Sequence, residues 1–477
     1  MSNNEGKNVF SKVFPDGTMI ETIYDPEAEE TRLAILQGGV VEVAQEYVDP
    51  KGDKYMPALC DDLIRKGFVK LPSACAGYTD IRELFQKIRK EFVPQSVDLP
   101  PQFQTVASLY VLLSWVYDSF QTIPYLRVIG NWGTGKSRFL QVVGSICYKS
   151  MMAGGSVSMA SIFRSLDKVQ GTFCFDEADF KTSDMSSEIT KILNGGHSKG
   201  SPVLRMDVDK KTGKMTTQAF NVYAPKILAS RERFKDEALE SRCLTEHLLP
   251  SKGAGTPIHL PDGFGGKALE LRNALLGFRF HMQGQIKAEP STLRGLELPR
   301  LKQSALALTS IAAAISEDVL GETLEYLATY ENELLIGQKH DPSADVLQCI
   351  LSLVMKKRSI DRPRWRIYMK EIAQQFMESG ESYSELYNGH DESNIYAQNS
   401  VSPRKIGSIV QKIGIKKHHD GRGFYIPLPQ ELRTLEILAE RYGFEIPWVK
   451  GTDGKATERP QPPIDEDDVS GADSVPF

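Results

Sequence analysis

One eight-residue stretch constrains the fold more than any other part of the sequence. The apolar run 125–129 before it predicts a buried strand, and the apolar residues of 139–146 after it have the spacing of a helix packed on a sheet. A strand, a glycine-rich loop and a helix in this order predict a phosphate-binding loop, because glycine lets backbone N–H groups close around phosphate oxygens. A chance glycine-rich turn is the alternative, and the flanking elements argue against it. The stretch matches G-x-x-x-x-G-K-[ST] and consists of Gly130, Asn131, Trp132, Gly133, Thr134, Gly135, Lys136 and Ser137.

The loop and a second motif together predict ATP and Mg²⁺ as cofactors. We expect Lys136 to reach the β- and γ-phosphates and the hydroxyl of Ser137 to ligate Mg²⁺. A second apolar run, 171–175, ends in Asp176 and Glu177. We expect Asp176 to hold Mg²⁺, directly or through water, and Glu177 to polarise the attacking water.

The acidic pair begins the letters D-E-A-D, which are the signature of one class of helicases. The rest of the sequence argues against that class. Only about 40 residues separate Lys136 from Asp176, and no second RecA-like half with its own motifs follows. The short spacing favours a compact α/β ATPase core instead.

A segment between the acidic pair and the next apolar run predicts a β-hairpin. Apolar and polar residues alternate over 204–208, and residues 215–223 return after a turn. Lysines on such a tip are most often solvated. In a ring-shaped ATPase the same tip would enter the central channel and hold DNA phosphates without reading sequence. The expected DNA-binding residues at the tip are Lys210, Lys211 and Lys214.

These motifs, in this order and spacing, resemble AAA+ ATPases of the pre-sensor-one hairpin clade. The resemblance is strongest to MCM-like replicative helicases of phages and mobile genetic elements, and superfamily-three helicases come next. It covers roughly residues 95–430. Three features depart from the family: Ser230 stands where most members have Asn, and neither a zinc-binding N-terminal domain nor a primase segment is recognisable.

The resemblance implies roles for two residues beyond the loop. The apolar run 226–230 ends in Ser230, at the place of a polar sensor for the γ-phosphate. Arg242, twelve residues further on, is expected to be an arginine finger for the nucleotide of a neighbouring subunit. The alternative for Arg242 is a surface arginine paired with Glu240 or Glu246.

A helical lid is expected to follow the core. Apolar spacing predicts helices over 268–286, 299–315 and 320–336. Arg300, at the start of the second helix, is the candidate for a second sensor arginine, and Arg294 competes with it. A solvated helix residue is the alternative for either arginine.

A different module is expected from residue 342 onward. A basic segment with interleaved aromatic residues spans 356–370, a capped helix is predicted over 402–413, and a basic hairpin with a tight turn at Asp420-Gly421 over 416–426. Helix and basic wing are typical of a winged-helix domain that binds DNA, although some winged helices serve protein contacts alone. The adjacent His418 and His419 lack further ligands for a metal. The expected DNA-binding residues are Arg404, Lys405, Lys412, Lys416, Lys417 and Arg422.

The sequence therefore predicts an α/β P-loop AAA+ core with a helical lid, a small β-rich N-terminal module and a C-terminal winged-helix domain. The acidic C-terminal segment ends in Val475-Pro476-Phe477 and resembles the tails of bacterial single-strand DNA-binding proteins. The resemblance implies that this segment could bind replication partners. The alternative is a tail that only increases solubility. The expected boundaries are 1–80 for the N-terminal module, 81–262 for the core, 263–341 for the lid, 342–450 for the winged helix and 451–477 for a disordered acidic tail.

Composition limits the setting in which the protein works. The formal net charge is only −5, from 57 Lys and Arg against 62 Asp and Glu, and no apolar run has the length of a membrane span. The six cysteines are scattered without a C-x-x-C pair, and Cys147, Cys174 and Cys243 lie in apolar runs, so we expect buried thiols in a reducing, cytoplasmic compartment. No membrane partner is expected.

Taken with the resemblance, these observations favour a ring-forming DNA helicase or translocase driven by ATP hydrolysis. The expected assembly is a homo-hexamer with single-stranded DNA in its channel and duplex DNA at the winged helix, working in the replication of a phage or mobile element. Two alternatives stay open. One is a replication initiator or loader that uses ATP as an assembly switch, and the other is an ATP-gated DNA-binding regulator.

Overall fold

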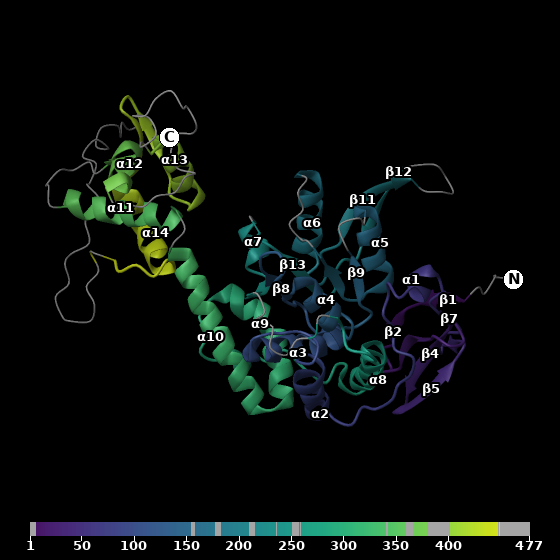
Figure 1. The fold of residues 1–477 in the computed structure, drawn as a ribbon. Coiled ribbons are helices and arrows are strands. Elements are labelled where there is room, and N and C mark those ends of the chain that lie inside the picture. Colours follow the sequence, from purple (N-terminus) through teal and green to yellow (C-terminus); the bar gives the residue numbers. More distant parts are fainter. Residues whose placement is uncertain are drawn as a thin grey trace, which may run out of the picture. The chain divides into compact units, whose positions relative to one another are not determined.

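A computed structural model shows how the chain folds (Figure 1). Contacts divide the chain into two compact units, Met1–Thr329 and Tyr330–Phe477. The boundaries expected from the sequence at residues 80, 262 and 341 stay predictions. The structure describes residues 6–153, 158–176, 183–208, 215–234, 236–249, 257, 259–339, 342–358, 366–378, 401–446 and 448.

The centre of the first unit is a five-stranded sheet in the order β14-β8-β13-β10-β9, in which every neighbouring pair is parallel. The central strands β8 and β13 are buried along their whole length, as expected for a parallel sheet covered on both faces. The α/β prediction is confirmed, and the predicted runs 125–129 and 226–230 coincide with β8 and β13. The strands are β8 (Tyr125–Ile129), β9 (Met151–Ala153), β10 (Phe173–Phe175), β13 (Lys226–Ser230) and β14 (Cys243–His247).

Helices lie around this sheet (Figure 1). The most deeply buried is α3, whose Tyr110 hydroxyl donates to the carbonyl of Lys226 at 2.9 Å and whose Trp115 indole donates to that of Ile146 at 2.9 Å. All three cysteines expected to be buried thiols, Cys147, Cys174 and Cys243, are buried. The helices are α3 (Pro101–Val116), α4 (Lys136–Gly144), α5 (Met159–Val169), α6 (Ser183–Gly195) and α7 (Glu237–Glu240), with α1 (Asp62–Arg65), α2 (Ile81–Gln86), η1 (Lys87–Phe92) and η2 (Tyr117–Ser119) before or between them.

Three long helices follow β14, as the apolar spacing predicted. The first begins four residues before the predicted start at 268, because Gly263, with φ of 76°, ends the preceding loop and the helix tolerates the glycines that follow. The helices are α8 (Phe264–Met282), α9 (Pro299–Ile315) and α10 (Glu317–Lys339), with the short η3 (Pro290–Leu293) before α9.

Two small sheets precede the core and pack against it within the first unit. The carboxylate of Glu21 on β3 is 2% exposed and accepts from the hydroxyl of Tyr148 at 2.7 Å and from Nε of Arg279 on α8 at 2.6 Å. These buried polar contacts tie the N-terminal strands to the core. The sheets have the orders β2-β3-β4-β5 and β1-β7-β6, formed by β1 (Lys7–Val9), β2 (Ser11–Val13), β3 (Met19–Asp25), β4 (Glu30–Gln37), β5 (Val40–Ala44), β6 (Tyr47–Val48) and β7 (Lys54–Pro57).

In its described residues, the second unit combines helices, including the end of α10, with an antiparallel sheet of order β15-β17-β16. The predicted helix over 402–413 is present as α13, with Ile406 and Val410 buried, and the predicted basic hairpin is present as β16 and β17. The name winged helix stays a prediction for this unit. The elements are α11 (Pro342–Arg358), β15 (Arg366–Tyr368), α12 (Met369–Glu378), α13 (Pro403–Lys412), β16 (His418–Asp420), β17 (Gly423–Pro427) and α14 (Leu428–Arg441).

The turn of this hairpin lies one residue later than predicted. Asp420 pairs with Gly423, so the two-residue loop is Gly421–Arg422 rather than Asp420-Gly421. The carboxylate of Asp420 accepts from Nη1 of Arg366 at 2.7 Å and from the hydroxyl of Tyr368 at 2.8 Å, which holds Asp420 in the strand. The partner strand β15 was not predicted from the sequence.

Candidate active site

Three glycines shape the loop between β8 and α4. A Cβ at Gly130 would lie 2.9 Å from the carbonyl oxygen of Leu248 and would also collide with Thr134, so no side chain fits there. Gly133 and Gly135 have φ angles of 80° and 88°, in the left-handed region that other residues avoid. The loop conformation therefore requires glycine at Gly130 and Gly135, which the motif specifies, and also at Gly133.

Lys136 is folded over this loop. Its Nζ donates to the carbonyl oxygens of Gly130 at 2.7 Å and Asn131 at 2.8 Å, and the Thr134 hydroxyl donates to Asn131 at 2.9 Å. Trp132 stands at the tip, 91% exposed. A glycine-lined loop with an ammonium group at its mouth, followed by the first turn of a helix, fits the phosphates of a nucleotide.

The parallel sheet brings the other expected nucleotide residues to the same edge. Asp176 directly follows β10, and Ser230 ends β13 opposite Ile129 in the ladder with β8. Because β13 separates β8 from β10, Asp176 lies two strand spacings, about 10 Å, from the end of β8. Ser137 is exposed and lies in the first turn of α4, directly after the loop. A hydroxyl and a carboxylate are oxygen ligands of the kind that Mg²⁺ prefers. Glu177 lies outside the described residues.

The hydroxyl of Ser230 forms a hydrogen bond within its own chain. It donates to the carbonyl oxygen of Glu232 at 2.9 Å, and the side chain is buried. The backbone carbonyl of Ser230 accepts from the amide of Gly130 at 3.3 Å, which links β13 directly to the loop. Ser230 is therefore placed beside the loop, with its hydroxyl turned toward Glu232.

Arg242 lies at the opposite edge of the sheet. Its carbonyl accepts from the amide of Tyr125, the first residue of β8, at 2.9 Å, whereas the loop follows Ile129 at the other end of that strand. The length of β8 puts about 13 Å between these edges. The structure therefore does not bring Arg242 to the phosphate-binding loop of its own chain.

Arg242 is held by one residue in the last turn of α6 and by one residue just after that helix. Its Nε donates to Nε2 of His197 at 3.2 Å, and its Nη1 donates to Oδ1 of Asn194. The alternative partner Glu240 is engaged elsewhere, because it accepts from Nη1 of the buried Arg127 at 2.7 Å. Sequence reasoning missed His197 and Asn194, since no motif marks them.

The environment of His197 keeps its ring neutral. Burial, and then the positive charge of Arg242, lower the pKa of His197 to about 4. A neutral ring with its proton on Nδ1 donates to the carbonyl of Asn194 at 3.0 Å and leaves Nε2 free to accept from Arg242. Asn194 is fixed in turn by a 3.1 Å hydrogen bond from its Nδ2 to Asp236.

Arg300 lies beside Arg242 rather than beside the loop. Its Nη1 donates to the hydroxyl of Ser241 at 3.1 Å. Burial lowers the pKa of Arg242, and the nearby charge of Arg300 adds to that shift. The competing Arg294 forms an exposed ion pair with Glu317. Of the two candidates, Arg300 is the one that shares a surface with Arg242.

The predicted hairpin over 204–223 is present as β11 (Val203–Val208) and β12 (Met215–Phe220), paired antiparallel over six residues each. Arg205 on β11 forms an ion pair with Glu188 on α6. The same helix carries Asn194, which holds Arg242. Helix α6 thus contacts both the base of the hairpin and the Arg242 surface. The tip residues Lys210, Lys211 and Lys214 lie outside the described residues.

Lys226 reinforces the end of α6. This fully buried lysine donates through Nζ to the carbonyls of Gly196 at 3.1 Å, Val222 at 2.8 Å and Ala224 at 2.9 Å. A Cβ at Gly196 would lie 2.6 Å from the carbonyl of Val222. The end of α6 and the segment that follows β12 are therefore packed as one piece.

The expected DNA-binding residues of the second unit lie on α13 and the hairpin. Arg404, Lys417 and Arg422 line one pocket together. Lys412 and Lys416 are exposed, and Lys405 is half-buried. The acidic tail 451–477 lies outside the described residues.

The parallel sheet and the glycine-rich loop define a P-loop α/β protein.

No protein-family model and no curated protein matches this chain. Solved structures that resemble it include the C-terminal region of NrS-1, at 12% identity over 85% of this chain and 96% of that chain, with a TM-score of 0.33. The SCCmec type IV Cch helicase matches at 9% identity over 95% and 77%, with a TM-score of 0.40. Aeropyrum pernix ORC2 in its ADP form matches at 12% identity over 77% and 99%, with a TM-score of 0.24.

A helicase and an ORC2 protein thus stand among the structural matches, but every TM-score quoted is below 0.5. These similarities identify no family for the chain. In the part of the chain that the structure describes, no helix is long and apolar enough to cross a membrane.

Proposed function

We propose that this protein is a ring-forming, ATP-dependent DNA helicase or translocase whose nucleotide sites lie between subunits. The observation that supports this proposal is the separation of Lys136 and Arg242 at opposite edges of one sheet. A loop for the phosphates and an arginine held away from that loop complement each other when two copies of the chain meet. The resemblance adds a hexamer and a role in replicating a phage or mobile element.

One subunit supplies the groups that bind and orient ATP. The loop amides and Lys136 bind the phosphates, and Ser137 and Asp176 would hold Mg²⁺, which would supply positive charge to the phosphate oxygens. Glu177 orients the attacking water and accepts its proton on a carboxylate oxygen. Ser230, whose carbonyl is hydrogen-bonded to Gly130 of the loop, exchanges its hydroxyl contact between Glu232 and the γ-phosphate.

The neighbouring subunit supplies Arg242. Its guanidinium stabilises the charge that develops on the transferred phosphoryl group. Arg300 adds a second positive charge on the same surface. Asn194 and His197 already hold the guanidinium of Arg242 before two subunits associate. The Arg242 side chain therefore loses less conformational entropy when it contacts the neighbouring nucleotide.

Helix α6 connects this chemistry to DNA. Its end contacts Arg242 through Asn194, and its middle contacts the hairpin through Glu188 and Arg205. A shift of α6 between nucleotide states moves the hairpin and its tip lysines along single-stranded DNA in the channel. In this proposal the second unit acts as a winged helix that engages duplex DNA through Arg404, Lys405, Lys412, Lys416, Lys417 and Arg422.

Strand displacement on a forked DNA tests the proposal, measured beside ATP hydrolysis and native mass. The wild-type chain should displace the strand only with ATP and should assemble into a ring. Lys136→Ala should abolish both activities, and Lys66→Ala, which removes an exposed lysine far from the loop, should leave both unchanged. ATP-dependent assembly without strand displacement would favour an initiator or loader. ATP-dependent DNA binding without hydrolysis-driven movement would favour a regulator.

A further inference from the structure

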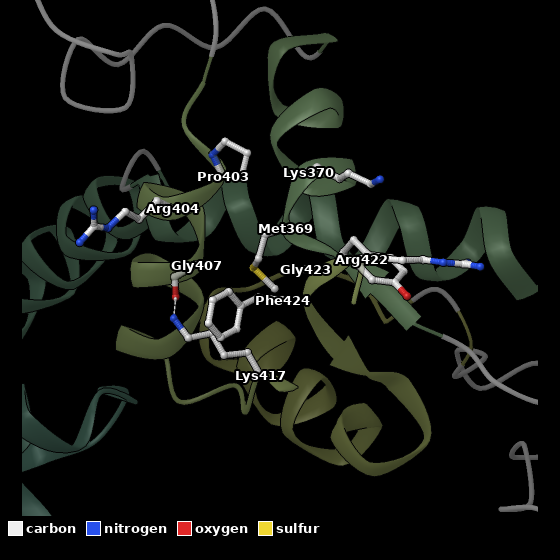
Figure 2. Close-up of a pocket in the computed structure, with 10 residues that line it drawn as sticks. Met369, Lys370, Pro403, Arg404, Gly407, Lys417, Arg422, Gly423 and Phe424 are labelled. Carbon is white, nitrogen blue, oxygen red and sulfur yellow. Dashed lines mark hydrogen bonds between the residues drawn. The ribbon is translucent and has the colours of Figure 1, made fainter. Parts of the chain in front are cut away.

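The second unit contains a pocket that the expected phosphate contacts do not explain. It has a volume of about 420 Å³, within the range of small-molecule sites, and lies between the start of α12, the start of α13 and the β16–β17 hairpin (Figure 2). Its lining consists of Tyr368, Met369, Lys370, Pro403, Arg404, Gly407, Lys417, Arg422, Gly423 and Phe424.

An aromatic ring forms the apolar part of this pocket. Phe424 is 51% exposed although it lies on a paired strand, and Figure 2 shows its ring next to the buried Met369. The ammonium of Lys417 lies 5.2 Å from the ring centroid and donates to the carbonyl of Gly407 at 2.9 Å. Lys417 is thereby tied to α13 beside the ring, His419 contacts the same ring with centroids 4.8 Å apart, and the partly exposed Phe424 belongs to the pocket lining.

Positive charges surround the ring, and the described residues that line the pocket include no acidic one. Arg404 and Arg422 extend from different sides of Phe424, and Lys370 stands at the end of α12 nearest the pocket (Figure 2). None of these three side chains forms an ion pair with a described carboxylate. The nearest acid on the hairpin, Asp420, is engaged by Arg366 and Tyr368. The pocket therefore complements a ligand that carries several negative charges and an apolar, flat surface.

We propose that this pocket binds one unstacked nucleotide of a single strand, with the base stacked on Phe424 and the flanking phosphates at Arg404 and Arg422. This inference deepens the proposed DNA binding of the second unit and rests on it. Duplex DNA offers phosphates on its outside but keeps its bases stacked inside. The ring of Phe424 can therefore stack only on a base that is not stacked within a duplex. Stacking of this kind does not depend on the identity of the base.

Fluorescence anisotropy with two short probes tests the pocket in the full-length chain. One probe is a thymidine oligonucleotide of about ten residues, and the other is an abasic strand of the same length and charge. Both are measured in protein that also carries Lys210→Ala, Lys211→Ala and Lys214→Ala, so that channel binding does not hide the pocket. Phe424→Ala should weaken binding of the thymidine probe about ten-fold and leave the abasic probe unchanged.

Matched variants separate stacking from loss of structure. Phe424→Tyr keeps an aromatic face and should bind the thymidine probe as the parent does. Ile437→Ala removes another exposed apolar side chain of the same unit, 58% exposed on α14 and outside the pocket lining, and should have no effect. Arg404→Ala should weaken binding of both probes and reduce the salt dependence of both.

Two results would overturn the inference: equal affinity of Phe424→Ala and parent for the thymidine probe, or equal losses on both probes. Unchanged thymidine binding combined with weaker binding of an oligoglutamate peptide would assign the pocket to an acidic protein segment instead. Strand displacement is measured separately on protein with an intact hairpin. Its absence, with base-dependent binding at Phe424 retained, would refute the helicase proposal and leave the pocket assignment standing.

Discussion

Nε of Arg242 donates to Nε2 of His197 across 3.2 Å, and this contact joins the strand edge that carries Arg242 to the end of α6. The contact needs a neutral imidazole, because a protonated ring has no acceptor at Nε2. Asn194, in the last turn of α6, holds the same guanidinium. Arg242 is thus a positioned arginine, set by residues that no motif identifies.

His197→Ala should lower the rate of ATP hydrolysis at saturating ATP by about ten-fold, because an arginine finger that is displaced by a fraction of an ångström loses much of its effect. The KM for ATP should change little, since Arg242 lies away from the loop that binds ATP in its own chain. His197→Gln offers an acceptor to Arg242 and should restore most of the rate. Steady-state kinetics of the three proteins provide the measurement. A large rise in KM without loss of rate would contradict a positioning role.

The folding stability of the chain should fall as the pH drops from 6.5 toward 4. The folded state lowers the pKa of His197 to about 4, whereas an unfolded histidine has a pKa of about 6.5. Between these values the unfolded chain binds more protons, so acid favours unfolding. After allowance for the partial exposure of His197, the contribution lost between pH 7 and pH 5 is about 1 kcal/mol. Urea unfolding at the two pH values measures it, and His197→Gln, which does not titrate, should show a smaller loss.

Mixing two inactive variants should restore part of the ATPase activity. Lys136→Ala removes the phosphate contact and Arg242→Ala removes the finger, so each variant alone lacks one half of every site. In a mixed ring, some interfaces join an intact loop to an intact arginine. ATP turnover is followed as the mixing ratio changes. Normal turnover by Arg242→Ala alone would show that the finger lies elsewhere.

Removing the hairpin charge should uncouple hydrolysis from movement. The triple change Lys210→Ala, Lys211→Ala and Lys214→Ala should abolish strand displacement and spare basal ATP hydrolysis, whatever the DNA sequence. The matched control replaces three exposed lysines of the first unit, Lys51, Lys66 and Lys87, by alanine and should retain both activities. Strand displacement that survives the hairpin change would favour the initiator or the regulator.

Glu21→Ala should destabilise the first unit by about 3 kcal/mol, because it leaves the buried Arg279 with one carboxylate partner, Asp118, in place of two. The hydroxyl of Tyr148 loses its acceptor as well. Glu42→Ala, on an exposed strand position, should change the free energy of unfolding by less than about 0.5 kcal/mol. Denaturant unfolding compares the two variants. Equal stability would mean that the N-terminal strands are not anchored through Glu21.

The sequence predicted the elements whose local pattern is strong. The apolar runs 125–129 and 226–230 could only be buried strands, and the helix periodicity of 299–315 was unambiguous, so these elements match the structure residue by residue. The hairpin turn at residues 421–422 was misplaced by one residue. A tertiary contact decided it: Asp420 is held in the strand by Arg366, more than fifty positions away.

Local sequence patterns could not predict contacts between segments that are distant in the chain. Nothing near His197 in the sequence indicates that Arg242 will face it, because the pairing depends on β14 lying beside β8. The strand β15 escaped notice for a similar reason, since three residues carry too little pattern to predict a strand. In the sequence, Phe424 looks like an ordinary apolar residue of a strand. Its exposure beside several cations depends on residues of α12 and α13, which are distant in sequence, so no local pattern predicts it.

The placement of Lys136 and Arg242 at opposite edges of the sheet has a consequence for how the enzyme responds to its own concentration. If the nucleotide sites are shared between subunits as we propose, a lone chain holds only half of each site, and dilution below the assembly threshold should abolish hydrolysis without unfolding any molecule. Turnover per chain would then rise with protein concentration and level off once rings are complete. Such a protein is switched on by local crowding of its own copies, for instance where many of them gather on one DNA, and stays idle when dispersed.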